Sequence, residues 1–543
     1  MNCEMFGGTA IYRPTHDAEL SVRQEAEAVL RKDVTAGTYT KKDEINAILQ
    51  RHFAFYDKML KEALPQIASL EVMDFVLKQY DISCHVNSMY LEGKVNNLVE
   101  RELWRRLGPN FRRATKYLAE CITMLAPTGP LSIKPEHAIE KIDRCWICAE
   151  QMVLLSNLST QTFVLFPDDT TLEIRPEGDQ EWFILRLNNP GPAEEYGEKI
   201  RRDTASRKDV IDELAMVYNH QRLKDVLDGP FKTSCGFCMT DVFQFCFSLN
   251  KNTTQPGPGF DVTFVAESQI LDSIQSILGG TADVAKRMFD GMALRRNAML
   301  HEGRVIWKPK QEYRAYTRPF FEFPHPTGTH FIWSRNMANE CLMMLYTRLV
   351  QKHLPSEWEV GSVPQAIEEY AAAITKEFES NVIACLDGLG IKAGRFKSSI
   401  GQGAAALQIP DLIGELDVLG YWEKEGLLVV GECKLVKPTH EPATFRDDIA
   451  KFTGGTNNYV TQVQRKTKWV LDNAKQVAAA LQSVKGFPAN VSVRQVAPVL
   501  VTYYPAFASL FINDMPCVAL TELFVDVRRA ATWPYTPVHE VTP

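Results

Sequence analysis

The chain has 543 residues, a formal net charge of -7, 45% apolar residues and 23% charged residues. These values are typical of a globular protein with a sizeable core, and the length favours about three to four domains. They exclude a polycation, so contacts with nucleic acid would have to come from local basic patches. No secretory signal or apolar run of membrane-spanning length is visible, and 12 cysteines are too few for a disulfide scaffold. We therefore expect a cytoplasmic protein without membrane contacts.

Residues 1–160 are expected to form a helical N-terminal region. Apolar residues recur at helical spacing in segments 43–64, 94–125 and 136–158. Residues 161–355 are expected to form a mixed helical central region with β hairpins. Its predicted strands are 162–166, 171–175, 181–187, 313–323 and 329–333, its predicted helices 268–280, 282–300 and 335–354, and its predicted loops 188–197 and 252–261.

A domain boundary is predicted at PSEWEVGSVPQ, residues 355–365, which contains prolines and glycine and has little periodicity. In 365–543 we expect the helix 367–390, a loop rich in Gly, Ser and Ala, the strands 415–422 and 427–436, the helix 456–482 and the strand 496–504. This order predicts a compact α/β domain. The predicted fold class is α+β multidomain, with a mainly helical N-terminal and central region that has small β insertions.

Two of these predicted strands carry charged residues. In LLVVGECKLV, Glu432 and Lys434 point to one face and Cys433 to the other, because side chains alternate along a strand. Glu415 and Asp417 share one face of the preceding strand. If the strands are neighbours, Asp417, Glu432 and Lys434 converge at one end of the sheet. Carboxylates there suit Mg²⁺ or Mn²⁺, and a lysine beside the metal can orient or deprotonate a water aimed at a phosphodiester.

Asp417, followed fifteen residues later by Glu432-Cys433-Lys434, resembles the PD-(D/E)xK nuclease superfamily, which has the restriction-endonuclease-like fold. The local form GELDVLG…VVGECK is similar to the GEIDx…ExK variant of that family. The chain also spells Pro-Asp at Asp411, but the loop before that residue indicates that it precedes the strand. Asp417 is therefore the preferred match.

The family also places a glutamate on the helix before the sheet. In KEFESNVIACLDGLGIKAG, Glu379 matches this position best and Glu377 is the near alternative. The resemblance covers residues 365–543 and implies a mixed sheet flanked by helices. It leaves residues 1–355 without an assigned role.

The resemblance implies a divalent-metal-dependent endonuclease that hydrolyses nucleic-acid phosphodiesters. DNA is favoured over RNA, because most of the superfamily cuts DNA. Asp417 and Glu432 would bind the metal together with the main-chain carbonyl of Cys433, and Glu379 would act directly or through a water. Lys434 would position the attacking water and stabilise the developing negative charge. A role in antiviral defence or repair rests on fold-level analogy alone, and a homodimer would allow two such sites to cut both strands.

The helix 456–482 carries polar residues after the second strand. Gln462 and Lys466, with Arg465 beside them, share a face at a period of 3.6 residues. They could line a path for phosphate groups. Members of the superfamily that this chain resembles often place a glutamine or lysine on this helix near the metal. A solvated polar face of an amphipathic helix explains the same pattern equally well.

A second family resemblance involves Arg296 and His301. The spacing Arg296-Asn297-x-x-x-His301 resembles the signature of HEPN ribonucleases, in which the two side chains meet at a dimer interface to cut RNA. The strands predicted downstream do not fit that helical bundle, so a packed or salt-bridged helix end is favoured. A third interpretation is a non-catalytic protein with a nuclease-like fold that binds nucleic acid or a partner. The intact Asp, Glu and Lys argue against it.

Two CxxC pairs occur, Cys145 with Cys148 and Cys235 with Cys238. Four thiolates can form a tetrahedral structural zinc site. The first pair, however, lies inside a predicted continuous helix, and buried core thiols are commoner than ligands in such a setting. Apolar packing is therefore the preferred interpretation of all four.

Overall fold

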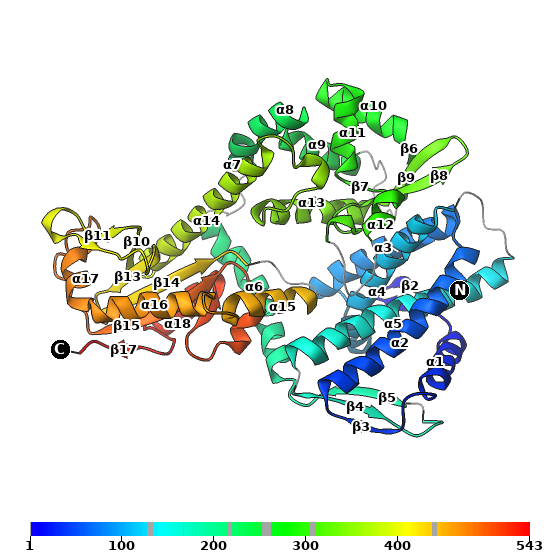
Figure 1. Cartoon of the computed structure of the whole chain (residues 1–543), viewed down its shortest axis with the longest axis horizontal. Helices are drawn as coiled ribbons and strands as arrows, with labels where there is room; N and C mark the ends of the chain where they lie inside the picture. Colours follow the sequence, from blue (N-terminus) through cyan, green and yellow to red (C-terminus); the bar gives the residue numbers. More distant parts are fainter. Residues whose placement is uncertain are drawn as a thin grey trace. The chain divides into compact units, whose positions relative to one another are not determined.

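The computed structural model describes residues 2–127, 134–166, 168–179, 181–213, 220–251, 262–302, 311–436 and 442–542 (Figure 1). The chain divides into two compact units. Unit 1 consists of Met1–Asn188 and His220–Ala371, and unit 2 consists of Asn189–Asn219 and Ala372–Pro543. Both units are mixed α/β structures.

Helices form most of unit 1, as the sequence predicts. α2 packs along α5 and α3 along α4, around one apolar core that includes Trp104 and Trp146. The helices are α1 (His16–Leu30), α2 (Lys42–Ala63), α3 (Leu70–Leu91), α4 (Leu98–Leu125), α5 (Pro135–Thr160), α7 (His220–Leu223), α8 (Gly229–Cys235), α9 (Met239–Lys251), α10 (Glu267–Leu278), α11 (Ala282–Asp290), α12 (Arg296–Glu302) and α13 (Arg335–Val350). Short 3-10 or π turns are η1 (Leu64–Gln66), η2 (Gln161–Leu165), η3 (Lys224–Asp228), η4 (Gln311–Tyr313) and η5 (Ser356–Trp358).

Small sheets cover parts of these helices. β1 (Asn2–Phe6) and β2 (Thr9–Arg13) form a hairpin, and a second sheet has the order β3 (Gly37–Tyr39), β4 (Thr170–Ile174), β5 (Phe183–Leu187). A third has the order β6 (Val262–Ala266), β9 (Gly328–Ser334), β8 (Phe320–His325), β7 (Ala293–Leu294). The pairings are antiparallel except that of β7 with β8. The strands predicted at 171–175 and 181–187 are confirmed as β4 and β5.

Three local predictions for the central region are wrong. The predicted strand 162–166 lies largely in the π turn η2, which continues α5 without a break. The predicted loop 188–197 contains the start of helix α6 (Gly191–Glu213), because Asn189 Oδ1 accepts from Gly191 N at 3.2 Å, and proline is tolerated in a first helical turn. The predicted helix 282–300 is interrupted by β7, since Gly291 ends α11 against the Trp358 indole. The predicted loop 252–261 lies outside the described residues.

Unit 2 contains the predicted α/β order with additional elements. Its elements are α6, α14 (Val363–Gly388, from Ala372 on), β10 (Lys392–Phe396), β11 (Ser399–Ile400), η6 (Gly403–Ala405), β12 (Leu407–Gln408), β13 (Leu416–Trp422), β14 (Leu427–Lys434), α15 (Pro442–Thr453), α16 (Tyr459–Asp472), α17 (Ala474–Leu481), β15 (Gln495–Thr502), η7 (Phe507–Phe511), β16 (Cys517–Ala519), α18 (Leu520–Ala530) and β17 (His539–Glu540). The helix predicted at 456–482 is divided into α16 and α17 at Asn473.

The unit boundaries differ from the boundary expected at 355–365. The division falls between Ala371 and Ala372, inside α14. Helix α6 comes from the segment 161–355, yet it belongs to unit 2. Unit 2 is therefore assembled from two separate stretches of the chain.

The main sheet of unit 2 has the order β10-β13-β14-β15-β16, with β17 also paired to β15. β10, β13 and β14 form an antiparallel meander, whereas β15 runs parallel to β14 and β16 runs parallel to β15. α16 packs on β14 and β15 (Figure 1). Every residue of β13 is buried, as is β14 up to Cys433, so both faces of these strands are covered.

Candidate functional site

Two carboxylates meet where β13 begins and β14 ends. The strands are antiparallel neighbours, with Val418 opposite Gly431, so Asp417 lies next to Glu432 across the ladder. Asp417 and Glu432 are 9% and 3% exposed. Asp417 Oδ2 accepts a hydrogen bond from Cys433 N at 3.0 Å, which fixes its side chain against the end of β14. The predicted neighbourhood of the two strands is confirmed.

Two lysines neutralise this pair. Lys434 Nζ lies 2.5 Å from Glu432 Oε1. Lys466 Nζ, from α16, donates to the other Glu432 oxygen, Oε2, and lies 3.6 Å from Asp417 Oδ1. The Lys466 side chain is only 7% exposed, so its ammonium sits inside the sheet–helix interface between the two carboxylates. The site thus contains two acidic and two basic groups in direct contact.

Helical periodicity explains the position of Lys466. The buried residues of α16 are Val463, Lys466, Thr467 and Val470, spaced as one stripe that faces the sheet. Val463 packs in the cluster containing Leu500, and Val470 in the cluster containing Val430. Lys466 lies between these two apolar clusters. Lys466, predicted on a possible phosphate path, therefore also belongs to the buried stripe of α16, which was not predicted.

Burial and charge change the proton affinity of the site. Burial, followed by the negative charge of Glu432, raises the pKa of Asp417 to about 6, although Lys466 opposes the rise. Burial works against the charged form of Lys434, but the Glu432 carboxylate more than offsets it, and the pKa of the ammonium is above its usual value. Lys434 is therefore a firmly protonated cation, and its ammonium also lies 4.8 Å from the centre of the Tyr459 ring.

Glu379 lies on α14 and is 8% exposed. Its Oε2 accepts a hydrogen bond from Arg395 Nη1, on β10, at 2.7 Å. Arg395 Nε also lies 3.3 Å from Glu415 Oε1, one residue before β13. The main contributions to the raised pKa of the Cys433 thiol are burial and then the charges of Asp417 and Glu379. Glu379 is therefore within electrostatic reach of Cys433, but its hydrogen-bond partner is Arg395.

The remaining candidates of unit 2 lie at the edge of this site or outside it. Asp411 is exposed in a turn before β13, as the sequence analysis inferred, and Glu377 is half-buried on α14. Gln462 Nε2 donates to Asn457 O at 3.2 Å. Arg465 is half-buried, and its Nε has no hydrogen-bond partner among the described residues.

The candidate ribonuclease pair lies in unit 1. Arg296 begins the short helix α12, and its Nε donates to Met124 O at 2.9 Å. Its main-chain N donates to Glu322 Oε2 at 2.8 Å, which ties α12 to β8. The guanidinium therefore holds two helices together. The side chain of His301 lies outside the described residues.

The CxxC pairs lie in apolar surroundings. Cys145 and Cys148 are buried inside α5 in the core of unit 1. Cys235 is buried, with its Sγ 3.6 Å from Trp358 O, and Cys238 is half-buried. Within the ranges that the structure describes, no three or more His, Cys, Asp or Glu side chains are grouped to hold a metal ion, so these four cysteines do not form a joint site.

Comparisons with protein-family models, with curated proteins and with solved structures find no match to this chain. Among the helices in the described ranges, none is long and apolar enough to cross a membrane.

Proposed function

We propose that unit 2 is a divalent-metal-dependent endonuclease that hydrolyses nucleic-acid phosphodiesters, with DNA as the favoured substrate. One observation carries this proposal: Asp417, Glu432 and Lys434 converge at adjacent ends of two antiparallel strands. The order of the sheet supports it, because a meander followed by a parallel strand and a covering helix agrees with the fold that the resemblance implies.

The residues present fit Mg²⁺ or Mn²⁺. Buried, adjacent carboxylates attract a cation, and burial together with the charge of Glu432 raises the pKa of Asp417 to about 6. Asp417 and Glu432 would hold the ion, with the Cys433 carbonyl and water as the remaining oxygen ligands. The bound ion would supply charge stabilisation at the phosphoryl oxygens and a more acidic water.

The protein's own groups would then act as follows. Lys434, whose pKa the Glu432 carboxylate holds above its usual value, would donate a hydrogen bond to the attacking water or to the phosphoryl oxygen and stabilise its growing negative charge. Asp417 is fixed by the Cys433 amide, so it needs little reorganisation. As water attacks, its oxygen forms a bond to phosphorus and its proton passes to bulk water, while the bond from phosphorus to the leaving sugar oxygen breaks and that oxygen takes up a proton from bulk water.

The decisive assay compares Asp417→Asn with Asp411→Asn. Supercoiled plasmid, single-stranded DNA and RNA are incubated with Mg²⁺ or Mn²⁺ and, as a blank, with a chelator. We expect metal-dependent DNA cleavage by wild type and by Asp411→Asn, whose exposed carboxylate precedes the strand, and no cleavage by Asp417→Asn. Absence of cleavage in wild type on every substrate would refute the proposal.

The same assay distinguishes the endonuclease proposal from the ribonuclease interpretation. If unit 1 cut RNA with Arg296 and His301, then His301→Ala would abolish RNA cleavage and Asp417→Asn would leave it unchanged. We expect the reverse pattern, because the Arg296 guanidinium is occupied with the Met124 carbonyl.

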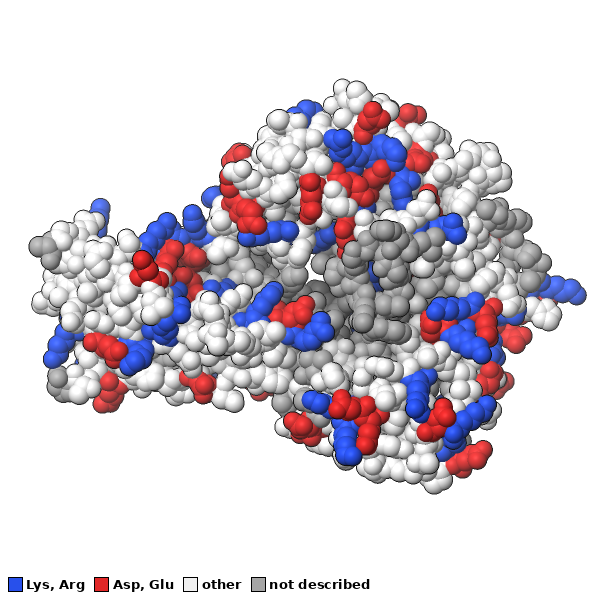
Figure 2. Space-filling view, viewed as in Figure 1, with Lys and Arg blue, Asp and Glu red and all other residues white. Residues whose placement is uncertain are grey.

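On the face shown in Figure 2, Lys and Arg alternate with Asp and Glu in small groups. A nuclease with this surface would bind nucleic acid with a modest salt dependence, because few phosphates are neutralised at once.

A further inference from the structure

Two histidines meet at the end of the β8–β9 hairpin in unit 1. Their ring centres are 4.6 Å apart, with 54° between the ring planes. The strand register explains the contact, because His325 pairs with Gly328, and His330 lies two residues further along β9 on the same face of the sheet. Since Gly328 has no side chain, the His325 ring can lean across its position toward His330.

The turn of the hairpin holds both rings through the same ring nitrogen. His330 Nδ1 lies 3.1 Å from Gly328 O, and since a carbonyl only accepts, this nitrogen carries the proton of the neutral ring. His325 Nδ1 lies 2.8 Å from Thr327 Oγ1, a hydroxyl that can accept in the same way. The Thr327 main-chain N is 3.4 Å from that nitrogen, beyond the usual range of about 2.7–3.2 Å, so the hydroxyl contact dominates. Both neutral rings therefore carry their lone pair on Nε2.

The Nε2 atoms of the two rings are unengaged. Among the described residues, none forms a hydrogen bond with either of them. His325 is exposed and His330 is half-buried, so solvent reaches the pair. The Phe264 ring on β6 stacks on His330, with 4.8 Å between ring centres and 21° between planes, which restricts that imidazole further. The hairpin thus presents two nitrogen lone pairs on rings that are held in place.

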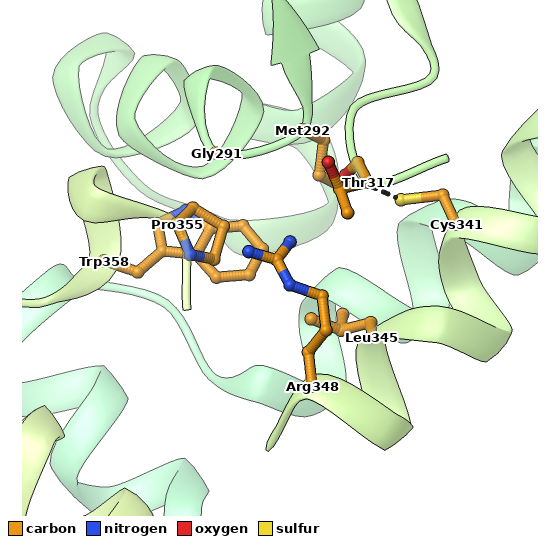
Figure 3. A pocket seen from close by; sticks show the side chains of 8 residues that line it. All are labelled: Gly291, Met292, Thr317, Cys341, Leu345, Arg348, Pro355 and Trp358. Atoms are coloured by element: carbon orange, nitrogen blue, oxygen red, sulfur yellow. Dashed lines mark hydrogen bonds between the residues drawn. The ribbon is translucent and has the colours of Figure 1, made fainter. Parts of the chain in front are cut away.

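Solvent access distinguishes these rings from the pocket beside Arg348, which is also in unit 1. Figure 3 shows the Arg348 guanidinium among side chains of α13 and η5. The free space there is about 10 Å³, which is room for a single water molecule. That pocket therefore has no space for a ligand, whereas the imidazoles lie at the surface.

We propose that His325 and His330 bind a late first-row divalent cation, Zn²⁺ in the first place, through their Nε2 atoms. Neutral imidazole nitrogen suits Zn²⁺ and Cu²⁺, whereas Mg²⁺ prefers oxygen. Histidines that bind metal ions commonly donate their other ring N–H to a carbonyl or another polar group, as these Nδ1 atoms can. Two protein ligands are fewer than the three or four of catalytic and structural zinc sites, so water would fill the remaining positions and the ion would exchange readily.

Calorimetric titration of the full chain with Zn²⁺ tests this site, which does not depend on the nuclease proposal. Excess Mg²⁺ is present throughout, because it competes for the carboxylates of unit 2 and leaves imidazoles free. We expect His325→Gln and His330→Gln each to weaken binding by about tenfold or more. The double variant should bind hardly more weakly than either single one, because a chelate is lost with its first ligand. His16→Gln, which changes an exposed histidine on α1, is the matched control and should bind like wild type.

A second readout does not depend on the stability of the variants. The electron paramagnetic resonance spectrum of wild type with equimolar Cu²⁺ should show coupling to two imidazole nitrogens, and that of His325→Gln coupling to one. Additive losses in the double variant, or coupling to a single nitrogen in wild type, would overturn the proposal. Equal Zn²⁺ binding by wild type and His325→Gln would overturn it as well. An equal loss in His16→Gln would mean adventitious coordination by surface histidines only, with the same consequence.

Discussion

At the scale of single residues, the state of Lys434 decides its chemistry. Its ammonium contacts Glu432 and lies over the Tyr459 ring, and its pKa is above the usual value. A raised pKa favours the protonated ammonium and makes Lys434 a poor acceptor of a proton from water. Of the two roles that the sequence left open, orienting and deprotonating the water, the structure therefore favours orientation and charge stabilisation.

Lys434→Met tests this role. The thioether keeps the apolar stem and removes the charge, so we expect DNA cleavage to fall about 100-fold or more while the far-UV circular dichroism is unchanged. Lys468→Met is the matched control, because Lys468 lies on α16 with 77% of its side chain exposed, paired to Asp472. Similar cleavage rates in wild type and Lys434→Met would remove Lys434 from the mechanism.

At the scale of elements, α16 covers the site and places Lys466 between its two carboxylates. The ammonium stands between Asp417 and Glu432, where a divalent cation would also bind. In the metal-free protein it therefore compensates the carboxylates, and in the metal-bound protein the two cations would repel each other. If the site binds a metal ion as proposed, the same side chain would stabilise the metal-free fold and oppose metal binding.

Lys466→Gln should separate these two effects. Without metal the variant should be less stable by about 3 kcal/mol, since two buried carboxylates lose their partner. Its Mn²⁺ affinity should rise about tenfold, because the competing charge is gone. Unfolding in a chelator and titration with Mn²⁺ measure both, with Lys468→Gln as the control. Weaker Mn²⁺ binding by Lys466→Gln would mean that Lys466 does not compete for the site.

The contact between α3 and α13 gives a prediction about pH. Asp81 on α3 is fully buried and accepts a hydrogen bond from Asn336 N at the start of α13, at 3.2 Å. Burial raises its pKa to about 6. Between about pH 4 and 6, the unfolded chain has released a proton that the folded chain still holds, so Asp81 makes the protein less stable as pH rises.

Asp81→Asn should remove this dependence. The variant should gain roughly 2 kcal/mol in free energy of unfolding relative to wild type between pH 4 and pH 7. Urea unfolding across that range measures the difference, and Asp74→Asn on the same helix, whose side chain is 37% exposed, serves as the control. A constant difference between Asp81→Asn and wild type at all pH values would contradict the assignment.

The strong periodic elements could be predicted from the sequence, and the contacts at their ends could not. The apolar, β-branched run in LLVVGECK located β14, and the alternation of side chains along a strand placed Glu432 and Lys434 on a common face. The burial of Lys466 depends on which stripe of α16 meets the sheet, and its i+3 and i+4 spacing from valines was the available signal. β10 escaped prediction because KAGRF alternates weakly and contains a glycine. Its residue Arg395 could not then be placed beside Glu379.

At the scale of the whole molecule, unit 2 depends on a helix from the middle of the chain. Tyr196 of α6 is buried, with its ring centre 5.0 Å from that of Phe507, and its hydroxyl donates to Pro505 O at 3.3 Å. Asp203, also on α6, accepts from Thr521 Oγ1 at 2.5 Å. Arg207 stacks on Tyr504 at 4.3 Å. These contacts join α6 to η7 and α18, which no local sequence pattern could indicate.

A fragment of residues 365–543 alone should therefore be incomplete. It would expose the apolar surface that Tyr196 covers, and truncation of a buried aromatic of this size costs about 3 kcal/mol. We expect a lower Tm for this fragment than for the same fragment linked to residues 189–213. The linked fragment with Tyr196→Ala should lose most of the gain, which separates packing by α6 from a general effect of a longer chain. If the linked and unlinked fragments unfolded at the same temperature, α6 would be dispensable for unit 2, and the nuclease proposal could be tested on residues 365–543 alone.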